Sequence, residues 1–92
     1  MATPYGFTPL GYDQVTSLGS ATNLPSIPHG AIMVLVSCST AAVRWRDDGV
    51  APTASVGMPL AVGQEFQYAG DLAGIRFIQQ ASGAVLDISY YR

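Results

Sequence analysis

Short runs of β-branched and aromatic residues recur along this chain, and glycine, proline, asparagine, aspartate and serine separate them. A spacing of about 8–12 residues between turns is typical of β-sandwiches and barrels, and helical periodicity is hard to find. The pattern predicts strands at residues 11–17, 31–38, 42–47, 58–62, 65–68, 75–79 and 84–91, and a loop at residues 19–30 with a short extended piece at 23–24. Because no long helical crossover is available, we expect consecutive strands to pair antiparallel.

The predicted fold is all-β: a compact antiparallel β-sandwich, jelly roll or small barrel of about seven or eight strands, with an extended N-terminal arm. Residues 1–10 are expected to form the arm, because Pro4 and Pro9 disfavour helix and limit ladder hydrogen bonding. Residues 11–92 are expected to form a single β domain. A chain of 92 residues buries a smaller fraction of its surface than a large domain does, so we expect oligomerisation to add stability.

The strongest strand, residues 31–38, is apolar on both faces, which is typical of a central strand buried on both sides. Further along, alternation sends Arg44 and Arg46 to the face opposite Trp45. Pro59 restricts its strand to an edge or a bulge. Together the apolar faces predict a core that contains Val34, Leu35, Val36, Trp45, Phe66, Phe77, Leu86 and Ile88.

The composition adds that the surface is poor in charge. Only 11% of the residues are charged, lysine is absent, and the net charge is −2. Because arginine is enriched and lysine depleted at interfaces, such a surface suits contact with protein; a compositional bias of the source genome is the alternative explanation. The chain lacks the basic stripe of nucleic-acid-binding proteins and any apolar run near the ~20 residues of a membrane span.

The single cysteine and the first residues bear on the compartment. Because Cys38 is the only cysteine, the chain can form neither an intrachain disulfide nor a thiolate cluster. Its position at the end of an apolar strand predicts a small buried side chain. The start, Met-Ala-Thr-Pro-Tyr, has neither the basic nor the apolar region of a signal peptide. We therefore expect synthesis and folding in a reducing cytoplasm.

Candidate catalytic and metal-binding residues are few. His29 lies in a Pro-His-Gly turn with no visible orienting partner, so a hydrolase site there is the weakest alternative. Asp47 and Asp48 are adjacent and point to opposite faces of a strand, so they cannot flank one glycosidic bond. A calcium site that uses Asp47, Asp48 and Asp87 stays open as an alternative. We predict no enzymatic activity, no cofactor and no metal.

The run Arg-Trp-Arg-Asp-Asp-Gly at residues 44–49 is the densest group of polar recognition chemistry, with two bidentate donors, an indole and two carboxylates. Tryptophan and arginine are enriched at binding hot spots. The alternative is a strand with a buried tryptophan and a solvated charged face. The predicted interface residues are Arg44, Arg46, Asp47, Asp48, Tyr5 and Phe7.

Several segments together resemble a family. They are Tyr-Gly-Phe at 5–7, Ile-Pro-His-Gly-Ala at 27–31, Ala-Val-Arg-Trp-Arg-Asp-Asp-Gly at 42–49, Ala-Pro-Thr at 51–53 and Ser-Tyr-Tyr at 89–91. This combination resembles small β-sandwich proteins encoded among the virion genes of tailed bacteriophages. The resemblance implies a head decoration, or cement, protein that is made in the host cytoplasm, binds the outside of the capsid and bridges major capsid protein subunits or other virion proteins.

Two alternatives to this role remain. One is a tail, fibre or head-tail adaptor module of the same kind of particle. The other is a small carbohydrate- or peptide-binding module, which would need a concave patch of exposed aromatics drawn from Tyr5, Tyr12, Tyr68, Tyr90 and Tyr91. In the decoration role we expect a homo-oligomer in which Arg44 and Arg46 bind carboxylates of a partner and the N-terminal arm lies along an adjacent subunit.

Overall fold

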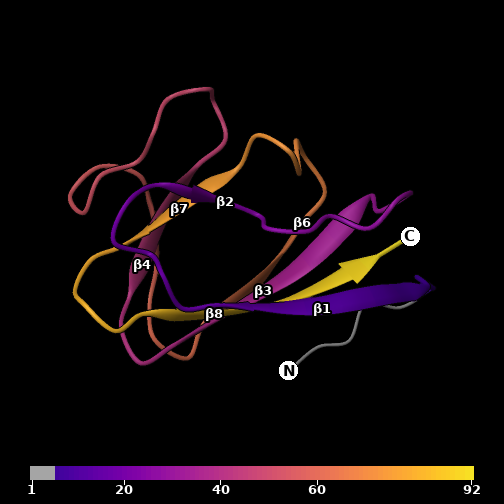
Figure 1. Ribbon diagram of the computed structural model, residues 1–92, viewed down its shortest axis with the longest axis horizontal. Helices are drawn as coiled ribbons and strands as arrows, with labels where there is room; N and C mark the ends of the chain where they lie inside the picture. The colour runs from indigo at the N-terminus through magenta and orange to yellow at the C-terminus, as the bar shows by residue number, and fades with distance from the viewer. Residues whose placement is uncertain (1–5) are drawn as a thin grey trace.

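The chain folds into two antiparallel four-stranded sheets that enclose one core, as the computed structural model of residues 6–92 shows (Figure 1). Sheet A has the order β1 (Pro9–Val15), β8 (Val85–Tyr91), β3 (Met33–Ser39), β6 (Glu65–Tyr68). Sheet B has the order β2 (Thr22–Asn23), β7 (Arg76–Gln79), β4 (Val43–Arg46), β5 (Met58–Leu60). The prediction of an all-β fold is confirmed, and the two sheets make it a small β-sandwich. No helix in the described residues is long and apolar enough to cross a membrane.

The seven predicted strands are present with boundaries that differ by two residues at most, and the short extended piece predicted at 23–24 corresponds to β2 at Thr22–Asn23. The largest shift is in β1, which begins at Pro9. The Thr8 N–H donates to the Arg92 carbonyl at 2.8 Å, and the Arg92 N–H donates to the Thr8 carbonyl at 2.9 Å. Residues 8–10 of the predicted arm therefore pair with the C-terminal end of the chain, while residues 1–5 lie outside the described part.

The core lies between the inner faces of the two sheets. Its buried residues are Leu18, Leu24, Val34, Val36, Cys38, Val43, Leu60, Tyr68, Leu72, Ile75, Phe77, Ala84, Leu86, Ile88 and Tyr90. Trp45 and Phe66 were predicted inside it but are only half-buried at its border. Leu35 is buried on the opposite face of sheet A with Met33 and Tyr91, so β3 is buried on both faces as predicted.

Pro59 lies in the edge strand β5, as predicted. It is oriented so that its missing N–H removes no hydrogen bond between β4 and β5. The Gln80 N–H donates to the Ala42 carbonyl at 2.8 Å, so Ala42 and its even-numbered neighbours in β4 turn their backbone groups toward β7. Val43 and Trp45 consequently bond to β5, opposite Leu60 and Met58. The nitrogen of Pro59 faces away from β4, where no donor is needed.

Candidate protein-binding site

Arg44 anchors the loop that joins β4 to β5. Its Nη1 donates to the carbonyl of Gly57 at 2.8 Å. The side-chain amide of Gln80 lies beside the same guanidinium, and when its oxygen faces Arg44 it accepts from Nε at 2.7 Å and from Nη2 at 3.2 Å. The guanidinium therefore has partners within the domain, which gives Arg44 a structural role that the sequence did not indicate.

The next polar residues have separate partners. Arg46 donates from Nε and Nη2 to both carboxylate oxygens of Asp48, at 3.0 and 2.5 Å. This hydrogen bonding by Arg46 lowers the pKa of Asp48. Asp47 instead accepts from the Tyr68 hydroxyl at 2.7 Å, and that hydroxyl accepts from the Asp71 N–H at 2.8 Å. Asp47 and Asp48 therefore point to different partners, as expected of adjacent residues.

Residues 47–57 form an ordered loop that Thr53 closes. Thr53 and Val56 exchange backbone hydrogen bonds of 2.9 and 3.2 Å, and Oγ1 of Thr53 accepts from the N–H groups of Ser55 and Val56. Pro52 is buried beneath the loop. These contacts, together with the Arg44 bond to Gly57, tie residues 53–57 to one another and to β4, which reduces the conformational entropy that the loop loses when it binds a partner.

Gly57 sets the path by which the loop rejoins β5. Its φ is 145°, and a Cβ at this position would lie 3.1 Å from the carbonyl oxygen of Trp45 and 3.2 Å from Cβ of Arg44. We expect Gly57→Ala to lower the free energy of unfolding by about 1–3 kcal/mol, measured by urea denaturation. Gly49→Ala is the matched control, because Gly49 also has positive φ but open space around it. Equal losses in the two variants would show that this crowding has no energetic weight.

Three apolar side chains stand exposed on the outside of the loop and at its junction with β5: Val50 (51%), Val56 (52%) and Met58 (57%). Val56 and Met58 line a recess of about 360 Å³ together with Arg46, Asp47, Asp48 and Gly57. We call Val50, Val56, Met58, Arg46 and Asp48 the loop surface. Apolar side chains beside an ion pair are typical of surfaces that bind protein.

A second recess, of about 260 Å³, adjoins the loop surface at Met58. It lies between the edge strands β5 and β6, and the half-buried rings of Trp45 and Phe66 line it. These rings stack with their centroids 5.1 Å apart and their planes 10° apart. Trp45 therefore faces inward as predicted, yet its ring borders a recess that is open to a partner.

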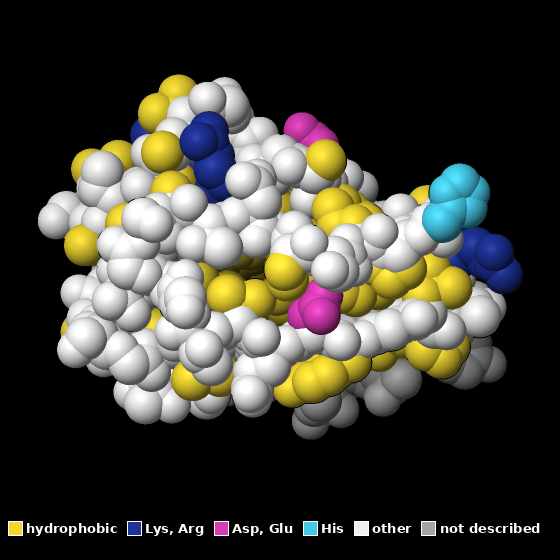
Figure 2. All heavy atoms as spheres, in the orientation of Figure 1, with side chains coloured by type: hydrophobic (Ala, Val, Ile, Leu, Met, Phe, Trp, Pro, Cys, Tyr) yellow, Lys and Arg dark blue, Asp and Glu magenta, His cyan; other side chains and the backbone are white. Residues whose placement is uncertain are grey.

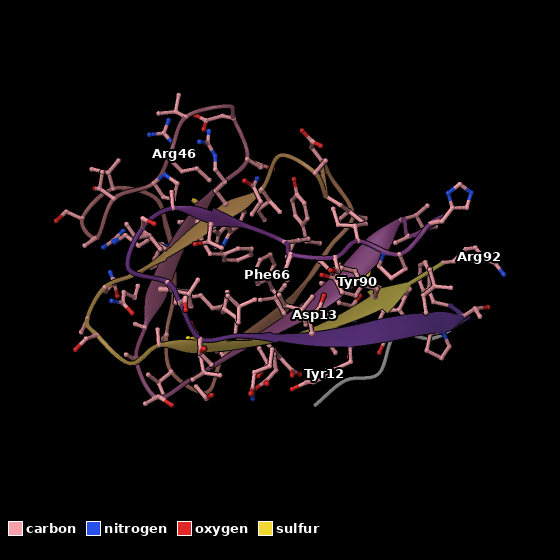
Figure 3. All side chains as sticks on the ribbon, viewed as in Figure 1. Tyr12, Asp13, Arg46, Phe66, Tyr90 and Arg92 are labelled. Atoms are coloured by element: carbon pink, nitrogen blue, oxygen red, sulfur yellow. The ribbon has the colours of Figure 1, made fainter. Side chains whose placement is uncertain are left out.

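The other predicted interface residues do not join the loop surface. Phe7 is 40% exposed, and the adjacent Thr8 pairs with Arg92. Figure 3 places Arg92 and Arg46 at opposite ends of the molecule. Tyr5 lies outside the described residues. The structure thus brings together the predicted residues of β4 and its following turn, and separates Phe7 from them.

The described tyrosines of the alternative aromatic patch do not form one surface. Tyr68 and Tyr90 are buried in the core, Tyr91 is buried on the outer face of sheet A, and Tyr12 is 60% exposed. The Tyr90 hydroxyl donates to Oδ2 of Asp13 at 2.9 Å, and Figure 3 shows the two side chains pointing toward each other from β8 and β1. Figure 2 shows a band of hydrophobic side chains across the middle of this face, with one acidic side chain in it and basic side chains toward the periphery. A carbohydrate site built from these tyrosines is therefore not formed.

The alternative calcium site is also not formed. Asp47 and Asp48 bind Tyr68 and Arg46, whereas Asp87 lies in β8 and accepts from Tyr12. Within residues 6–92, no group of three or more His, Cys, Asp or Glu side chains is placed to hold a metal ion. His29 is exposed in its turn.

Comparisons with known proteins do not assign the chain to a family. No protein-family model matches it, and no curated protein sequence or solved structure matches it significantly. The described residues define a small two-sheet antiparallel β-sandwich with an ordered, partly apolar loop at one end.

Proposed function

We propose that this protein is a structural component of a bacteriophage particle, a decoration protein that binds the outside of the head and bridges neighbouring major capsid protein subunits. The ordered loop that exposes Val50, Val56 and Met58 carries the proposal. A preorganised apolar patch of this kind gains free energy from burial without a large ordering cost. The resemblance to small β-sandwich virion proteins makes the capsid the expected partner.

The ion pair on the loop surface supports selectivity of binding. In water the exposed Arg46–Asp48 pair adds little to the stability of the free domain. When a partner covers it, the same pair discriminates between surfaces that satisfy its charges and surfaces that do not. Repetition of the contact over many symmetric copies then strengthens the whole shell.

The composition of purified phage particles tests the proposed location. We expect mass spectrometry to find this chain in a copy number comparable with that of the major capsid protein. A few copies per particle would indicate the tail, fibre or adaptor alternative instead. Absence from the particles would contradict any role as a virion component.

Variants of the loop test the proposed contact. Val56→Asp and Met58→Asp place a charge on the loop surface, and we expect each to weaken binding to assembled heads about tenfold or more in a cosedimentation assay. Val62→Asp is the matched control, because Val62 is 54% exposed in the turn after β5 and outside the loop surface. Binding that all three variants retain at the wild-type level would exclude the loop surface as the capsid contact.

A further inference from the structure

The charged side chains of the two sheets are segregated by sign. On the outer face of sheet B, Arg46 lies directly opposite Arg76, and Arg44 follows on the same face of β4. Like charges placed opposite one another destabilise a sheet unless a negative group lies between them. Asp48 supplies such a group to Arg46, but no described residue forms an ion pair with Arg76. We call Arg44, Arg46 and Arg76 the arginine face.

The outer face of sheet A carries the opposite charge. Ser37 of β3 lies between Glu65 of β6 and Asp87 of β8, so one row across the sheet holds two carboxylates. Gln14 of β1 continues the row beside Asp87. None of the described strand residues of sheet A is an arginine. We call Glu65 and Asp87 the acidic face.

The acidic face contains a recess beside the Asp87 carboxylate. It has a volume of about 300 Å³ and is lined by Tyr12, Leu35, Ser37, Asp87 and Ser89. The Tyr12 hydroxyl at 2.5 Å and Nε2 of Gln14 at 3.0 Å both donate to the same oxygen of Asp87, Oδ1. These bonds hold the carboxylate in place, while Oδ2 receives no hydrogen bond from a described residue.

This recess suits a guanidinium group better than an ammonium. The free Oδ2 of Asp87 and the hydroxyl oxygens of Ser37 and Ser89 supply several acceptors around one space. Leu35 adds an apolar wall, against which a planar and weakly hydrated guanidinium packs favourably. An arginine side chain on another protein surface would therefore fit the chemistry of this recess.

We propose that a second copy of this chain supplies that arginine, with Arg76 of the second copy entering the recess beside Asp87. The arginine face and the acidic face are complementary in charge, and Arg76 is the member of the arginine face to which no described residue supplies an ion pair or a side-chain hydrogen bond. Because two different surfaces meet, the contact is head-to-tail, and each added copy leaves one free face at either end of the assembly. The proposal concerns self-association and does not depend on capsid binding.

Sedimentation velocity at low ionic strength tests self-association. We expect the wild type to form species larger than a monomer, and added salt to disperse them, because screening weakens contacts between charged surfaces. Arg76→Glu and Asp87→Asn should each raise the dissociation constant about tenfold or more. Arg92→Glu, which makes the same charge change outside both faces, should associate like the wild type.

A mixture of the two variants distinguishes a head-to-tail contact from any other. Arg76→Glu keeps an intact acidic face, and Asp87→Asn keeps an intact arginine face, so an equimolar mixture should form a heterodimer and stop there. Circular dichroism melts verify that both variants are folded, and Arg76→Gln replaces Arg76→Glu if the latter is not. A wild type that stays monomeric, or a mixture that stays monomeric or grows beyond dimers, would overturn the proposal.

Discussion

Replacement of Leu86 by alanine is expected to lower the free energy of unfolding by about 2–5 kcal/mol. Leu86 lies on the inner face of β8 and is only 1% exposed, with Val15 and Cys38 as its cross-strand neighbours. Truncation removes buried apolar area and leaves a cavity that the surrounding strands cannot fill. A small domain has about 5–15 kcal/mol of total stability, so this single change removes a large share of it.

Two valines provide a matched comparison for the same measurement. Val36 is fully buried in β3, whereas Val85 is half-buried on the opposite face of β8 from Leu86. Val36→Ala should cost about 2 kcal/mol in urea denaturation and Val85→Ala less than half of that. If Leu86→Ala and Val36→Ala cost no more than Val85→Ala, the assignment of the inner faces to a common core would be wrong.

Stability is also expected to fall steeply above about pH 10, because the fold keeps the two core tyrosines Tyr68 and Tyr90 protonated. Burial, followed by the hydrogen bond to Asp47, raises the pKa of Tyr68 to about 12. Burial, followed by the hydrogen bond to Asp13, also raises the pKa of Tyr90 well above its ordinary value. Both groups ionise at about pH 10 in the unfolded chain. Their contribution is complete below that pH and is lost toward the folded pKa, by up to about 1.4 kcal/mol per pH unit for each tyrosine.

Denaturation at a series of alkaline pH values checks this expectation. Tyr68→Phe removes one ionising group and should reduce the slope of stability against pH above about pH 10 by up to about 1.4 kcal/mol per unit. Burial also raises the pKa of the Cys38 thiol, but this group acts equally in both proteins and cancels in the comparison. Identical slopes for the variant and the wild type would contradict the assignment to Tyr68.

The positions of the strands could be predicted because short-range signals determine them. Alternation and flanking turn residues locate β6 at residues 65–68, where prediction and structure agree. The order of strands within each sheet could not be predicted, because β8 pairs with β1 and β3, which are distant in sequence. The start of β1 was placed too late because Pro9 argues against a ladder, whereas an edge strand with an irregular register between Pro9 and Gly11 accommodates it.

The candidate site was predictable in part. Alternation correctly placed Arg44 and Arg46 on the face opposite Trp45. The bond from Arg44 to Gly57 depends on how an eleven-residue loop returns to the sheet, which no local pattern specifies. Apolar loop residues such as Val56 resemble core residues in sequence, so their exposure could not be inferred before the fold was known. The position of Arg46 in β4 directly opposite Arg76 in β7 likewise could not be predicted, because it depends on the strand register.

The central position of β8 in sheet A has a consequence for folding during synthesis. Strands β1 and β3 do not pair with each other, and each of them pairs with β8, which the ribosome makes last of the three. Sheet A therefore cannot close until residues 85–91 have left the exit tunnel, and the apolar faces of the earlier strands stay uncovered until then. We expect the domain to fold after translation of β8, on the millisecond-to-second timescale typical of non-local β pairing. We expect the nascent chain to be prone to aggregation during this interval, because its apolar faces and strand edges are uncovered.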